Sequence, residues 1–71
     1  DFRIGLHGLN YHPQAAGLAA ELQGAFPQCT VELVESGGGA FEVFLGGTQI
    51  YSKLATGRFP AYQEIPLLSL G

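Results

Sequence analysis

Apolar and polar residues alternate along four short segments of this chain, a pattern typical of strands with one buried face. The segments fall within residues 1–8, 29–35, 41–45 and 48–53. In the first segment, Phe2, Ile4 and Leu6 alternate with polar or small residues. Gly46-Gly47 separates the last two segments and is the kind of two-residue connection that type I′ or II′ hairpin turns require. We therefore predict four strands, of which the last two form a hairpin.

Residues 14–26 form the only segment with the three- and four-residue apolar spacing of a complete amphipathic helix. Its predicted buried stripe consists of Ala15, Leu18, Ala19, Leu22, Ala25 and Phe26. Pro13 fits the first helical position, where the missing N–H costs nothing, with His12 as the predicted cap. Pro27 ends the helix because the residue before a proline is disfavoured in the helical region. We therefore predict one main helix between the first and second strands.

The last part of the chain predicts a short closing helix. Phe59-Pro60 opens it, and Pro66 limits it to about one turn or a little more from Ala61 onward. The helix between the first two strands favours a parallel crossover, and the hairpin adds antiparallel strands. The sequence thus predicts an α/β (α+β) fold of order β-α-β-β-β(-α). This is a two-layer sandwich of a mixed sheet, one main helix and a short or truncated C-terminal helix.

Composition and charge narrow the classes of protein. The 71 residues are 46% apolar and 13% charged, which indicates one folded domain over residues 1–71 rather than a disordered chain. The net charge is −3, with three basic residues and no basic cluster, so we expect no nucleic-acid binding. No apolar run approaches the ~20 residues of a membrane helix, so no membrane interaction is expected. The single cysteine rules out an internal disulfide and favours a reducing, cytoplasmic compartment.

The segment 36–60 carries three short motifs, Gly-x-Phe-Glu, Ser-Lys and Gly-x-Phe-Pro. Their residues are Gly39, Phe41, Glu42, Ser52, Lys53, Gly57, Phe59 and Pro60. Together with the hairpin between them, these motifs closely resemble those of the selenoprotein W-like (Rdx) family. The resemblance is close over residues 26–60 and covers residues 1–25 in outline. It implies a thioredoxin-like fold and a small redox domain.

The redox motif of that family is Cys-x-x-Cys, or Cys-x-x-selenocysteine, between the first strand and the first helix. A helix N-terminus at this place lowers the pKa of a thiol and so supplies the thiolate. Counting back from Phe26-Pro27 gives one placement of the motif, and anchoring on the first strand gives another. The placement counted back from Phe26-Pro27 consists of Leu6, His7, Gly8 and Leu9. The placement anchored on the first strand consists of residues 9–12. Neither placement contains a thiol, so no catalytic residue is expected.

The remaining candidate groups have structural interpretations. Cys29 follows the predicted helix, whose C-terminus disfavours a thiolate, so we interpret it as a structural thiol, with oxidation or an intermolecular disulfide as the alternative. His7 and His12 have no Cys, Asp or Glu at a ligand spacing, so no metal site is expected. No cofactor is expected either, because the glycine-rich residues 36–39 lead into a strand, whereas a phosphate loop leads into a helix.

The apolar tail contains Leu67, Leu68 and Leu70, and two interpretations of it are open. It is either a truncated or frayed closing helix packed on its own sheet, or an exposed surface that binds a protein partner or a second copy of the chain. Our first hypothesis for function is an Rdx-type domain that lacks thiol redox activity and acts as a binding or structural module. The alternative is a thiol–disulfide oxidoreductase of cell redox homeostasis, acting through Cys29 or through a motif not represented in this sequence.

Overall fold

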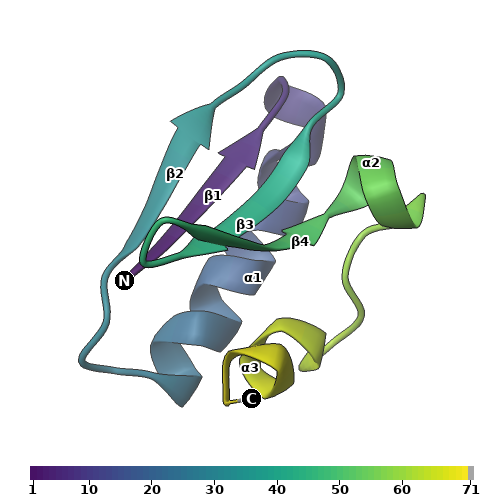
Figure 1. The fold of residues 1–71 in the computed structure, drawn as a ribbon. Helices are drawn as coiled ribbons and strands as arrows, with labels where there is room; N and C mark the ends of the chain where they lie inside the picture. Colours follow the sequence, from purple (N-terminus) through teal and green to yellow (C-terminus); the bar gives the residue numbers. More distant parts are fainter. Residues whose placement is uncertain (71) are drawn as a thin grey trace.

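A four-stranded mixed sheet forms one layer of the molecule (Figure 1). The computed structural model describes residues 1–70, apart from the side chain of Leu9. The strands are β1 (Phe2–Leu6), β2 (Val31–Glu35), β3 (Phe41–Leu45) and β4 (Thr48–Ser52). Their order across the sheet is β2-β1-β3-β4, with β1 and β2 parallel and the other neighbours antiparallel. The predicted mixed sheet and its hairpin are therefore confirmed.

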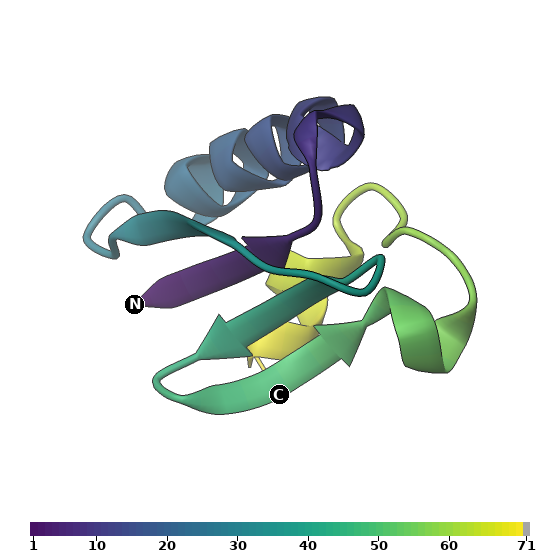
Figure 2. The same ribbon diagram turned by 90° about the horizontal axis from the view of Figure 1, so that it is seen from above.

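The helices form the second layer. They are α1 (His12–Ala25), α2 (Lys53–Thr56) and α3 (Glu64–Leu70), with a 3-10 turn, η1 (Leu9–Tyr11), before α1. α1 and α3 lie side by side on one face of the sheet, whereas α2 is a single turn that follows β4 (Figures 1 and 2). The two-layer sandwich with a short C-terminal helix is thus confirmed. None of the helices within residues 1–70 has the length and apolar character needed to cross a membrane.

The core lies between the two layers and receives side chains from α1, from the sheet and from α3. Its buried members are Phe2, Ile4, Leu6, Ala15, Leu18, Leu22, Phe41, Val43, Tyr51 and Ile65. Side chains alternate between the two faces of a strand, so the register partners Ile4 and Val43 both point inward and are fully buried. Each fully buried aliphatic side chain stabilises the fold by about 1.5–3 kcal/mol. Ile65 joins α3 to the same cluster as the sheet and α1.

The observed α1 differs from the predicted helix at both ends. Tyr11, not His12, is its N-cap residue, and the Tyr11 side chain makes no capping hydrogen bond. Pro13 lies in the first turn, where its missing N–H leaves no intrahelical bond unmade. Phe26 is the C-cap residue and packs against the core, whereas Ala25 is exposed. The predicted burial of Ala25 is therefore wrong, because Ala25 is the last residue of α1 and the fully buried part of the helix ends at Leu22.

The two glycines between β3 and β4 determine the type of turn in this hairpin. Gly46 and Gly47 have φ values of +58° and +87°, and a type I′ turn requires positive φ at both central positions. β4 ends at Ser52, one residue before the predicted end at Lys53. Ser52 caps α2, since its Oγ accepts the N–H of Ala55 at 3.3 Å. The chain therefore leaves the sheet through a capped helical turn.

The closing helix α3 is longer than predicted and starts later. It begins at Glu64, not at Ala61, after Gln63 with a positive φ of +68°. Pro66 was predicted to limit it to about one turn, yet α3 continues to Leu70. The reason is that Pro66 lies in the first turn, where a backbone N–H has no intrahelical partner to lose.

Candidate functional site

The connection from β1 to α1 contains both predicted placements of the redox motif. Leu6 ends β1 and is only 2% exposed, so its side chain belongs to the core. His7 is exposed, and Gly8 has a φ of +80°, which turns the chain into η1. The side chain of Leu9 lies outside the described part of the chain. The second placement, residues 9–12, covers η1 and the first residue of α1.

The glycine-rich loop after β2 is attached to this connection by hydrogen bonds. The Gly39 N–H donates to Nδ1 of His7 at 2.8 Å, and the His7 N–H donates to the carbonyl of Ala40 at 3.0 Å. Gly39 has a φ of +74°, a conformation that glycine adopts without a steric penalty. His7 Nδ1 therefore acts as an acceptor that fixes the loop. Within residues 1–70, no group of three His, Cys, Asp or Glu side chains is arranged to hold a metal ion.

Three aromatic rings pack edge to face beside the β1–α1 connection. The ring centroid of Tyr11 lies 6.5 Å from that of Phe41 and 5.1 Å from that of Phe59, and the Phe41–Phe59 distance is 5.2 Å. The Lys53 ammonium lies 5.4 Å from the centroids of both Tyr11 and Phe59, which is cation–π geometry. One residue from each of the three signature motifs thus lies in this cluster. The signature residues Phe41, Lys53 and Phe59 are explained by this packing.

The other signature residues shape the backbone between β4 and α3. The Ser52 hydroxyl contacts Glu42 Oε2 on the neighbouring strand at 3.4 Å. Gly57 follows α2 in the left-handed region, at φ +78°, and its N–H donates to the carbonyl of Lys53 at 2.7 Å. A left-handed residue that closes a helix is most often glycine. Pro60 is half-buried at the end of the Gly-x-Phe-Pro motif.

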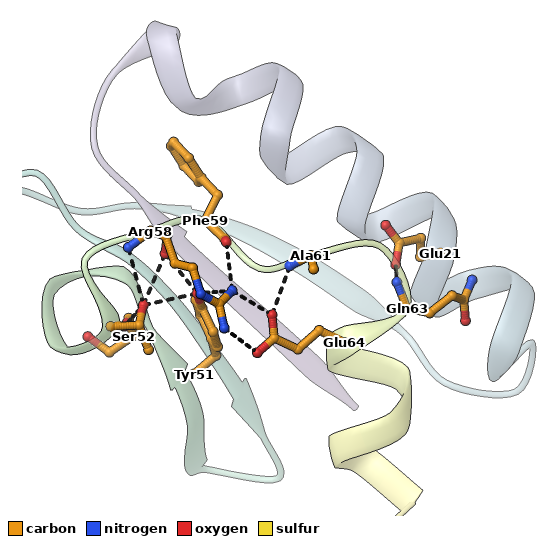
Figure 3. Close-up of polar contacts among 9 residues, drawn as sticks. Glu21, Tyr51, Ser52, Arg58, Phe59, Ala61, Gln63 and Glu64 are labelled. Carbon is orange, nitrogen blue, oxygen red and sulfur yellow. Dashed lines mark hydrogen bonds and ion pairs between the residues drawn. The ribbon is translucent and has the colours of Figure 1, made fainter.

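Arg58 and Glu64 form an ion pair that connects this segment to α3 (Figure 3). Arg58 Nη1 and Nη2 donate to the two Glu64 carboxylate oxygens at 2.7 and 2.9 Å, and the Ala61 N–H donates to Oε1 at 2.8 Å. The hydrogen bond from Arg58, followed by that from Ala61, lowers the pKa of Glu64 to about 2. The same carboxylate raises the pKa of Arg58. The Tyr51 hydroxyl donates to the Arg58 carbonyl at 2.7 Å and joins β4 to this network.

Sequence reasoning missed the Arg58–Glu64 pair. The two residues are joined across an irregular turn, where neither the helical nor the strand repeat applies. One local signal was present: Glu64 stands three residues after Ala61, the spacing at which a capping-box glutamate reaches back to a backbone N–H.

Cys29 lies at the other end of the sheet from the β1–α1 connection. It precedes β2, which begins at Val31 and not at the predicted residue 29. The Cys29 N–H donates to the carbonyl of Phe26 at 2.9 Å, and its side chain packs half-buried against the core. Val31 pairs with Phe2, the first residue of β1. Leu6 lies at the other end of that strand, roughly 13 Å from Phe2 at about 3.3 Å per residue. The structure therefore does not bring Cys29 together with the motif positions.

The parallel β1–α1–β2 unit, the β3–β4 hairpin and the closing helix on the same face define a thioredoxin-like α+β protein. Within that class the chain belongs to the Rdx family, whose model matches residues 8–67. The family predicted from the signature motifs is thus confirmed.

Two solved structures are similar to this chain over nearly its whole length. A selenoprotein W-related protein from Vibrio cholerae is 27% identical, with 96% of this chain and 91% of that chain covered and a TM-score of 0.80. A protein from Bordetella parapertussis is 25% identical, with 96% and 92% covered and a TM-score of 0.81. No curated protein matches the chain.

Proposed function

We propose that this chain is an Rdx-type domain that acts as a binding or structural module and carries out no thiol–disulfide exchange. Exchange begins with attack of a thiolate on a disulfide sulfur, which requires a thiol at the reacting position. The observation that supports the proposal is the residue at position 6. In the placement counted back from Phe26-Pro27, the family motif would begin at Leu6, which is buried in the core and so contributes packing in place of a reactive sulfur. The other placement, residues 9–12, contains no thiol either.

Cys29 is a poor replacement for the missing motif. Its half-buried side chain packs against the core, and it follows the C-terminal end of α1. An exchange reaction at Cys29 would also lack a second thiol in the chain to resolve the mixed disulfide.

A turnover assay tests this proposal directly. The purified chain is compared with its Cys29→Ser variant and with an active thioredoxin in insulin reduction and in glutathione-coupled reduction of a small disulfide. We expect the chain and its variant to give the same rate as buffer, while thioredoxin turns over. Thiol-dependent turnover that is lost in Cys29→Ser would contradict the proposal and support the oxidoreductase alternative.

A further inference from the structure

The outer side of α3 and the turn before it expose several large apolar side chains. Tyr62 is 80% exposed, Leu67 67%, Leu68 49% and Leu70 73%. The inner side of α3 is anchored, since Ile65 and Pro66 are buried. α3 therefore packs on the core, as expected for a closing helix. Its outer side is nevertheless an exposed apolar surface, as expected for a binding segment. Single exposed leucines are ordinary, but four large apolar side chains in one stretch form a patch.

A groove lies next to this patch, between α1 and the turn that leads into α3. Its volume is about 470 Å³, Tyr62 forms part of its wall, and Gly17, Ala20 and Gly24 contribute small residues from α1. Glu21 and Gln63, which are hydrogen-bonded to each other, form its polar part. A Cβ atom added at Gly17 or Gly24 would meet no other heavy atom within 4 Å. The helix surface is therefore open enough to receive a leucine side chain from outside. One side of the molecule thus carries both projecting apolar side chains and a recess.

The charges of the molecule favour this side for contact between two identical chains. α1 and α3 contain one acidic residue each, and both carboxylates are engaged within the chain: Glu21 accepts the Gln63 N–H at 2.9 Å, and Glu64 binds Arg58. The remaining carboxylates belong to the strands or to the chain start. They are Asp1, Glu32, Glu35 and Glu42. Glu21 keeps its charge, so the two helices together with Arg58 carry a formal charge of −1 and the rest of the chain −2. Two copies therefore repel each other less when their helical sides meet.

The edges of the sheet are less suited to self-association. On β4, a β-bulge interrupts the pairing with β3, and the Gln49 side chain donates to the carbonyl of Tyr51 at 3.4 Å. On β2, Glu32 and Glu35 are exposed and would face a second acidic edge. Bulges and charged residues on edge strands are the usual obstacles to strand pairing between chains.

From these observations we propose that a second copy of this chain binds the α1–α3 side in a two-fold symmetric dimer, with the α3 leucines of each copy seated in the α1 groove of the other. This inference rests on the binding role proposed above and names the partner. A standard interface of roughly 800 Å² per partner is about a fifth of the 4176 Å² accessible surface of the chain. A domain of this size buries little surface alone, so it gains stability from the added burial.

Sedimentation velocity from low to high micromolar concentration tests the dimer. We expect the chain to change from monomer to dimer in this range, with Leu67→Glu/Leu70→Glu and Ala20→Glu each weakening the dimer at least tenfold. The matched control is Leu54→Glu, because Leu54 is 60% exposed but lies on α2, away from this side. Its dimer dissociation constant should equal that of the unsubstituted chain. Thermal unfolding of each variant at low concentration checks that the monomer folds.

Three results would overturn the inference. A chain that stays monomeric throughout leaves the apolar surface to a different protein, and a dimer unchanged by both α1 and α3 variants uses another surface. A dimer that survives Ala20→Glu but not the α3 substitutions refutes the reciprocal seating in the groove. These outcomes are distinct from failure of the proposed function, which is measured by thiol turnover and not by molecular mass.

Discussion

Glu64 joins two segments through one carboxylate. Its oxygens accept hydrogen bonds from Arg58 on the turn and from the Ala61 N–H just before α3. The carboxylate lies at the solvent boundary, so solvent screening limits what the pair contributes to stability. Its bidentate geometry connects the turn at Arg58 to the first residue of α3.

Glu64 makes the fold less stable as the pH falls into the acid range. Its pKa is about 2 in the folded chain against an ordinary value of 4.5, so the unfolded chain binds the proton more readily. Its contribution is therefore complete above about pH 4.5 and is lost as the pH falls toward 2. We expect Glu64→Gln to lower the melting temperature by a few degrees at pH 7 and to have a smaller effect near pH 2. Melting curves across this range measure the difference, and Glu32→Gln, at an exposed carboxylate on β2, controls for the loss of one negative charge.

At the scale of elements, local chemistry determines some segments and tertiary contacts determine others. The hairpin was predictable because Gly46-Gly47 specifies its own turn, and α1 because its apolar spacing needs no partner to be recognised. The start of α3 was not, since it depends on a carboxylate bound by an arginine across a turn. Likewise, the signature motifs were enough to predict the family. The contacts of Lys53 and Phe59 with the Tyr11 ring arise from tertiary packing, and no periodic pattern in the sequence reveals them.

The two glycines of the hairpin should respond to substitution in opposite directions. Asparagine tolerates left-handed backbone and precedes glycine in many type I′ turns, so Gly46→Asn should raise the free energy of unfolding by about 0.5–1 kcal/mol. Alanine does not tolerate the left-handed backbone of position 47, at φ +87°. Gly47→Ala should therefore lower the free energy of unfolding by about 1–2 kcal/mol. Urea denaturation of both variants measures the difference. Equal effects of both substitutions would mean that the turn is not type I′.

At the scale of the whole molecule, one core includes elements from both ends of the chain. Ile4 of β1, Val43 of β3 and Ile65 of α3 are all fully buried in the same cluster. The closing helix is therefore part of the cooperative unit and not an appendage. Domains built around one small core usually unfold in a single transition.

Substitution of Ile65 tests whether α3 belongs to this unit. We expect Ile65→Ala to lower the free energy of unfolding by about 2–4 kcal/mol, because it leaves a cavity where the helix meets the sheet. Leu54→Ala removes a comparable side chain that is 60% exposed and should cost less than about 0.5 kcal/mol. Circular dichroism and tyrosine fluorescence should give the same midpoint for Ile65→Ala. Two separate transitions would show that α3 melts independently of the sheet.

The burial of Leu6 has a consequence for protein engineering of this domain. A cysteine introduced at position 6 would be smaller than the leucine and would leave unfilled space between β1 and the helices. At about 0.8 kcal/mol for each buried methylene, the replacement removes roughly 1–2 kcal/mol from a fold of limited size. A design that installs a thiol at this position therefore needs compensating substitutions among the neighbours of Leu6.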